Sequence, residues 1–67
     1  MKIKYDKEAD VVYLRFRKGK IAESDEIKEG VIVDFDAKGV PLAIEILNAK
    51  EIMDNKPELI VDFPKAP

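Results

Sequence analysis

Residues 31–47 read VIVDFDAKGVPLAIEIL and contain two alternating apolar patterns on either side of a short polar segment. The first places apolar side chains at positions 31, 33 and 35, and the second at positions 42, 44 and 46. A period of two is typical of a strand with one buried face. Between the two patterns, residues 37–40 include Gly39 and predict a hairpin loop built on a type I turn.

The register of this hairpin follows from the same patterns, because a slip of one residue would turn one apolar set away from the core. The resulting pairs are Val33 with Ile44, Ile32 with Glu45, and Phe35 with Leu42.

Further elements are predicted on both sides of the hairpin. Residues 11–17 alternate in the same way, residues 3–5 begin a shorter strand, and residues 21–24 form another, joined to 11–17 by a turn at Gly19. Residues 50–55 predict a short helical turn capped by Asn48 and ended before Pro57, and residues 58–63 predict a strand or an extended arm. The whole pattern predicts a mostly β, α+β fold: a small antiparallel β-meander with one short C-terminal helix and an extended C-terminal arm. We expect a single domain over residues 1–67, with a core at 1–49 and an extension at 50–67.

The composition limits how so small a domain can be stabilised. A chain of 67 residues buries a small core, and the absence of Cys and His excludes disulfides and zinc sites built on thiolate or imidazole. Oligomerisation is the reinforcement that remains, so we expect a homodimer.

Composition also bears on location and origin. No apolar run is long enough to span a bilayer and the N-terminal residues lack the apolar centre of a signal peptide, which predicts a cytoplasmic protein without membrane contact. Amides are scarce while Lys and Glu are abundant, a thermophile-like composition.

Catalytic and cofactor-binding residues are not expected. Ser24 is the only hydroxyl of the serine type, and no Thr, Cys or His can activate it or form a triad. Asp34, Asp36, Gly39 and Glu45 occupy positions 1, 3, 6 and 12 of a calcium-binding EF-hand loop, but Lys38 stands at position 5 and the flanks alternate as strands. We therefore predict a hairpin here, with no metal, no cofactor and no enzymatic activity.

Charged residues are grouped along the chain. Arg15, Arg17, Lys18 and Lys20 form a basic cluster that Lys2 and Lys4 join if the first two strands pair, and such a cluster could follow the phosphates of a nucleic acid. The acidic residues Glu23, Asp25, Glu26 and Glu29 follow at once, and the net charge is -2. Charge pairing across a solvated sheet is the preferred interpretation, and nucleic-acid binding is kept as an alternative.

The second face of the predicted sheet carries apolar residues where a solvated face would be polar. The cover could be the helix at 50–55, the arm at 59–63 or a second chain. We predict that the last two combine in a dimer contact formed by Val11, Tyr13, Ile32, Leu47, Leu59, Ile60 and Phe63.

Several ordered motifs resemble those of the YuzE-like family of small proteins, domain of unknown function family 2283. They are YDKEAD at 5–10, VYLRF at 12–16, AES at 22–24, GVIVDFD at 30–36, Gly39 and IEILNA at 44–49. The resemblance implies a compact β-rich domain with no catalytic residues to carry over. The resemblance also suggests an antitoxin-type regulator that binds a small basic toxin-like partner. The pattern of the chain as a whole predicts a small non-enzymatic protein-interaction module that self-associates, and the antitoxin-type regulator is kept as an alternative.

Overall fold

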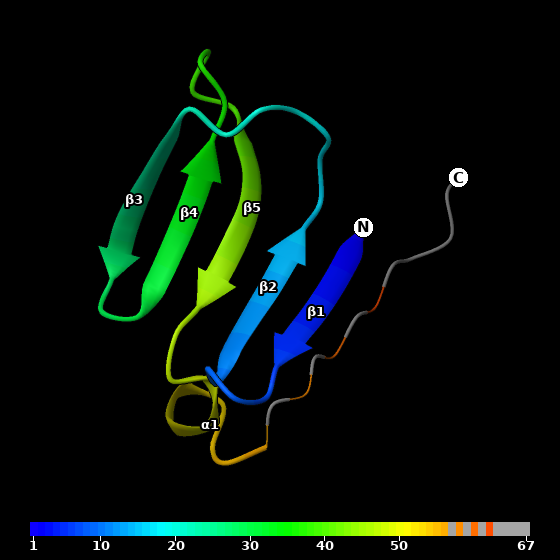
Figure 1. Cartoon of the computed structure of the whole chain (residues 1–67), viewed down its shortest axis with the longest axis vertical. Coiled ribbons are helices and arrows are strands. Elements are labelled where there is room, and N and C mark those ends of the chain that lie inside the picture. The colour runs from blue at the N-terminus through cyan, green and yellow to red at the C-terminus, as the bar shows by residue number, and fades with distance from the viewer. Residues whose placement is uncertain (57, 59, 61, 63–67) are drawn as a thin grey trace.

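The computed structural model describes residues 1–56, 58, 60 and 62 of the chain. This part of the chain forms a five-stranded antiparallel sheet and one short helix (Figure 1). The elements are β1 (Lys2–Asp6), β2 (Val11–Arg15), β3 (Glu23–Lys28), β4 (Val31–Phe35), β5 (Pro41–Ile46) and α1 (Ala49–Ile52). The predicted fold class, mostly antiparallel sheet with one short helix, is confirmed.

The strands do not lie in the sheet in their order along the chain. Their spatial order is β1-β2-β5-β4-β3, so a β1–β2 hairpin is joined to a β3–β4–β5 meander through pairing of β2 with β5. Residues 16–22, the crossover segment, run past the ends of β5 and β4 to reach β3 at the far edge (Figure 1). Gly19 therefore lies in a connection between distant strands and not in a hairpin turn between neighbours.

The β4–β5 hairpin has most of the predicted register. Val33 pairs with Ile44 and Ile32 with Glu45, whereas Phe35 pairs with Pro41 and not with Leu42. The reason is a bulge at this end of the pair, which leaves Leu42 as an extra residue on β5.

The bulged residue Leu42 anchors the crossover segment to the sheet. Its carbonyl oxygen accepts the backbone N–H groups of Phe16 and Arg17, at 3.0 and 3.2 Å. A Cβ atom at Gly19 would lie 3.2 Å from the Leu42 side chain, and Gly19 has a φ of 146°. Glycine is therefore required for the crossover segment to pass this close to Leu42.

Helix α1 is held at the opposite end of the sheet by the turn between β1 and β2 (Figure 1). The predicted cap, Asn48, makes no side-chain hydrogen bond because its backbone is left-handed, with a φ of 49°. Asp10 takes this role: its carbonyl oxygen accepts the Ala49 N–H at 2.9 Å and its carboxylate accepts the Lys50 N–H at 3.2 Å. No helix in the described part of the chain is long and apolar enough to cross a lipid bilayer.

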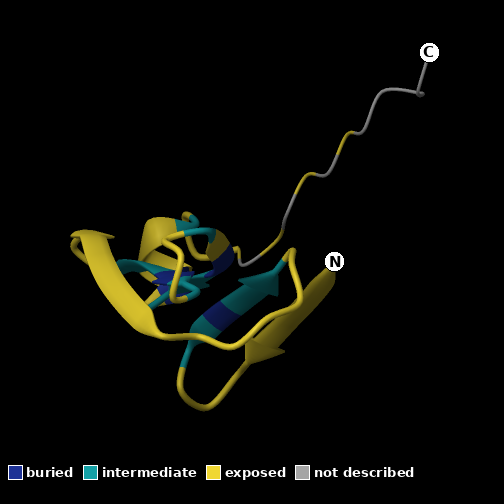
Figure 2. Ribbon diagram, turned by 90° about the horizontal axis from the view of Figure 1, so that it is seen from above, coloured by how far each residue is buried: buried dark blue, intermediate teal, exposed yellow. Residues whose placement is uncertain are grey.

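The buried core is small. Among the described residues the buried hydrophobic side chains are Val12, Leu42, Ala43 and Ala49, and two of these are alanines. Both edge strands, β1 and β3, are exposed along their whole length (Figure 2). The sheet thus has little hydrophobic burial of its own to stabilise it.

Candidate functional surfaces

One face of the sheet is apolar across four strands. In the register of the sheet Ile3 lies beside Leu14, Leu14 beside Ile44, and Ile44 beside Val33. A second row is formed in the same way by Tyr5, Val12, Ile46 and Val31. Directly opposed residues of antiparallel strands point to the same side of a sheet, so the two rows form one surface, which we call the apolar face.

The apolar face is only partly covered. Val12 is buried at 3% exposure, Ile3 and Tyr5 are exposed at 47% and 37%, and the other side chains of the two rows are half-buried. Within the described residues the main contacts between elements are those of neighbouring strands, so no second layer packs on this face. A sheet with one apolar face normally buries that face against another layer.

The residues predicted for a dimer contact lie elsewhere. Val11, Tyr13 and Ile32 are half-buried on the opposite side of the sheet, which we call the mixed face, and Leu47 is half-buried just after β5. Ile60 is 94% exposed, and Leu59 and Phe63 lie outside the described residues. The sequence patterns did identify the apolar face, but they assigned it to a closed core.

The carboxyl groups of Asp34 and Glu45 form a pair on the mixed face that was not predicted from the sequence. The alternation of residues 31–35 places the Asp34 side chain in solvent. Asp34 is buried, at 1% exposure, and its Oδ1 accepts the Ser24 hydroxyl at 2.5 Å, while its Oδ2 has no partner among the described residues. Glu45 can donate a hydrogen bond to Asp34 only when the Glu45 carboxyl group is protonated. This bond raises the pKa of Glu45, and burial and the charge of Asp34 act in the same direction.

This pair predicts a stability that depends on pH. The folded chain holds the Glu45 proton between the ordinary pKa of 4.5 and the raised folded pKa, and the unfolded chain does not. Stability is therefore expected to fall as pH rises through the folded pKa. Glu45→Gln keeps a hydrogen-bond donor beside Asp34 at every pH, so we expect a flatter profile and a gain of about 1 kcal/mol at about pH 7.

Urea unfolding at a series of pH values from about 4 to about 8 measures both effects. Glu8→Gln, in the exposed turn after β1, removes the same charge and should leave the slope of the parent unchanged. A Glu45→Gln profile as steep as that of the parent would contradict the assignment.

Asp36 organises the β4–β5 turn. Its Oδ1 accepts the backbone N–H groups of Lys38 and Val40, both at 2.9 Å, and its carbonyl oxygen accepts the Gly39 N–H at 3.0 Å. Gly39 has a φ of 80°, which the turn requires. Asp36 thus serves the hairpin, and no group of three or more potential metal-binding His, Cys, Asp or Glu side chains is found in residues 1–56, 58, 60 and 62.

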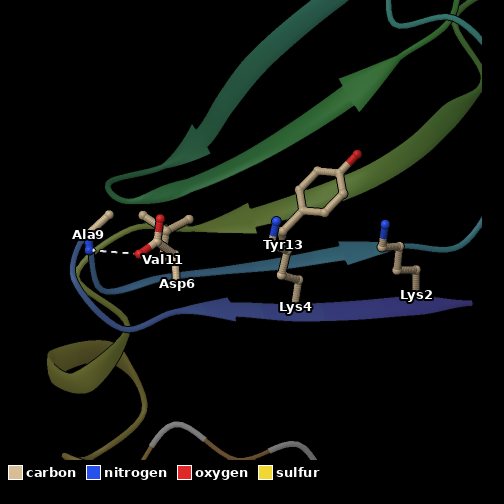
Figure 3. Close-up of a pocket in the computed structure, with 6 residues that line it drawn as sticks. All are labelled: Lys2, Lys4, Asp6, Ala9, Val11 and Tyr13. Carbon is tan, nitrogen blue, oxygen red and sulfur yellow. Dashed lines mark hydrogen bonds between the residues drawn. The ribbon is translucent and has the colours of Figure 1, made fainter.

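Pairing of β1 with β2 extends the basic cluster. Lys2 pairs with Arg15 and Lys4 with Tyr13, so the lysines of β1 lie beside the basic end of β2. Figure 3 shows Lys2, Lys4 and Tyr13 projecting from the same side of the two strands around a cavity of about 380 Å³. Arg15 has a structural role, since its guanidinium donates to the carbonyl oxygens of Arg17 and Gly19 and to the Tyr13 hydroxyl.

The acidic residues lie at the other edge of the sheet. Glu23, Asp25 and Glu26 are on β3, which pairs with β4 on one side and with no described strand on the other. Glu26 also closes the β3–β4 turn, because its Oε2 accepts the Gly30 N–H at 2.9 Å. The sheet therefore has a basic edge region at β1–β2 and an acidic edge at β3.

Comparison with known proteins identifies a family but no described relative. Residues 2–50 match the family model described as Protein of unknown function (DUF2283). The match confirms the resemblance to family 2283, while the YuzE-like designation stays a prediction. No curated protein and no solved structure matches the chain.

Proposed function

The chain belongs to the DUF2283 family of proteins of unknown function, and we propose that it is a small, non-enzymatic protein-interaction module that forms a homodimer. The observation that carries the proposal is the apolar face, whose two rows of side chains have no covering layer among the described residues. The proposed contact is between the apolar faces of two copies.

The energetics of a small sheet favour this contact. With two alanines among its four buried hydrophobic residues, the isolated sheet gains little from burial, and a domain of this size has a stability of only about 5 kcal/mol. Covering the exposed parts of the two rows contributes roughly 0.5 to 1 kcal/mol for each side chain. The sum of these contributions over both rows is comparable with the free energy of unfolding of the domain.

The dimensions of the sheet suit a second copy of the chain. Strands of five and six residues, spaced about 4.8 Å apart, give the four strands of the apolar face a footprint of roughly 19 by 17 Å before the relief of the side chains is counted. That is about 320 Å², below the roughly 600 to 1,000 Å² that each partner contributes to a standard interface, so the expected dimer is a weak one that dissociates on dilution. Two such sheets packed face to face would resemble a β-sandwich and would place the same residues on both sides of a two-fold axis.

The mass of the unmodified chain tests the proposal. Sedimentation equilibrium is expected to give twice the monomer mass at about 100 μM, with dissociation on dilution, and the thermal midpoint is expected to rise with concentration. A monomer at about 100 μM, with a midpoint that does not change on dilution, would exclude a functional dimer.

Two earlier expectations remain predictions beside this one. The contact through the mixed face and residues 59–63 is tested by the same mass measurement together with the variants described in the Discussion. The antitoxin-type alternative is supported by the position of Glu23, Asp25 and Glu26 on an exposed edge strand, where a basic strand of a partner could pair with β3.

A further inference from the structure

Two adjoining cavities lie along the β1–β2 half of the sheet. The larger, of about 380 Å³, is lined by Lys2, Lys4, Asp6, Ala9, Val11 and Tyr13 (Figure 3). The second, of about 290 Å³, is lined by Met1, Lys2, Arg15, Phe16, Arg17 and Lys18. Because Lys2 lines both, we treat them as one surface, the β1–β2 groove.

The lining of this groove is strongly cationic. It contains five Lys and Arg side chains and one carboxylate, that of Asp6. The Asp6 carboxylate is occupied within the β1–β2 turn, where its Oδ1 accepts the backbone N–H groups of Glu8 and Ala9, both at 3.1 Å. The groove therefore has a local positive charge although the chain as a whole has a net charge of -2.

Two aromatic side chains lie among these cations. Tyr13 is half-buried in the larger cavity, and Phe16, at 39% exposure, lines the second. Aromatic rings that are at least partly exposed beside lysines and arginines provide what single-stranded nucleic acid needs, which is a face for base stacking and cations for the phosphates. An acidic protein would use the cations but has no comparable need for the rings.

We propose that the β1–β2 groove binds single-stranded nucleic acid, with phosphates at Lys2, Lys4, Arg17 and Lys18 and bases against Tyr13 and Phe16. Arg15 acts as a positioning residue, because its contacts with the carbonyl oxygens of Arg17 and Gly19 hold the crossover segment in place. The acidic edge at β3 limits the contact to this half of the sheet, so binding is weak and sensitive to salt.

This binding does not depend on the proposed dimer. Lys2, Lys4 and Tyr13 project from the mixed face, and the dimer contact is proposed on the apolar face. Two copies packed through their apolar faces would each leave the part of the groove formed by Lys2, Lys4 and Tyr13 open. Loss of nucleic-acid binding and loss of self-association are therefore measured separately.

Fluorescence anisotropy with a labelled oligouridine of about 12 nucleotides tests the groove. At about 50 mM salt we expect a micromolar dissociation constant and a slope of log affinity against log salt of about -2 to -3, as for three or four phosphates. The double variant Lys2→Glu with Lys4→Glu should weaken binding more than about tenfold and reduce the slope. Tyr13→Leu should weaken binding about fivefold or more with the slope unchanged, because stacking does not release ions.

The matched control is Lys28→Glu with Lys38→Glu, which makes the same charge change outside the groove. It should change the affinity less than about threefold, and sedimentation should give the same mass for all of these variants. Absence of binding at about 100 μM protein would overturn the proposal, as would equal weakening by the control pair. Polyglutamate bound as tightly as oligouridine would also overturn it, because the groove would then be a site for acidic polypeptides.

Discussion

A chain carrying Ile44→Lys is expected to sediment as a monomer at concentrations where the parent chain is a dimer. Ile44 lies in the middle of the apolar face, between Leu14 on β2 and Val33 on β4. In the proposed dimer the new ammonium group would be pressed against a second apolar face without a partner, which costs several kcal/mol. We expect the dimer affinity to fall at least about a hundredfold, equivalent to about 3 kcal/mol.

The control makes the same substitution on the other side of the sheet. Ile32 is half-buried on the mixed face and pairs with Glu45, one position from Ile44. Ile32→Lys should leave the dimer intact. The opposite result, with Ile32→Lys monomeric and Ile44→Lys dimeric, would move the contact to the mixed face and contradict the proposal.

A milder variant covers the case in which Ile44→Lys does not fold. Ile3 lies in the same row but on the edge strand β1, where it is 47% exposed, so Ile3→Lys is not expected to disturb the sheet. Circular dichroism confirms folding before the mass is measured. A folded Ile3→Lys chain with the dimer affinity of the parent would argue against an interface that reaches β1.

The second large effect is expected from Leu42→Ala, which should destabilise the chain by about 3 kcal/mol. The Leu42 side chain is fully buried beneath Gly19, and the Leu42 carbonyl fixes the start of the crossover segment by two hydrogen bonds. The cavity left by the substitution cannot be filled by Gly19, which has no side chain. In a domain with a stability of about 5 kcal/mol this loss leaves about 2 kcal/mol, so about 3% of the chains are unfolded at about 25 °C and mild heating unfolds the rest.

Urea unfolding at a fixed protein concentration measures the loss, with Ile27→Ala, at a residue 54% exposed, as the control expected to cost less than about 1 kcal/mol. A cost below about 1 kcal/mol for Leu42→Ala would show that the crossover segment is not part of the cooperative structure. The two large effects are distinguishable. Leu42→Ala should lower the thermal midpoint at every concentration, whereas Ile44→Lys should abolish its dependence on concentration.

The strands were predictable because their apolar residues alternate. The pairs of Val33 with Ile44 and of Ile32 with Glu45 follow from that alternation and from the short loop between β4 and β5. The pairing of Phe35 was not predictable, since the bulge inserts a residue that the period of two does not reveal. The strand order was missed for a related reason: a glycine-containing turn after β2 is equally compatible with a hairpin and with a crossover.

The candidate functional surfaces were also predictable from the sequence only in part. Lys2 and Lys4 were assigned to the basic cluster on condition that the first two strands pair, and β1 does pair with β2. Burial of Asp34 was not predictable, because an aspartate in an alternating pattern is normally solvated and its contacts with Ser24 and Glu45 come from other strands. Whether an apolar pattern forms a closed core or an open face depends on the number of layers, which a sequence pattern does not encode.

The crossover segment has a consequence for the rate and order of folding. The β1–β2 hairpin and the β3–β4–β5 meander each contain only connections between sequence neighbours, whereas pairing of β2 with β5 closes a loop that includes all of β3 and β4. Local hairpins form in microseconds, and closure of a long loop costs entropy before its contacts can compensate for it. The β2–β5 contact is therefore the step that sets the barrier.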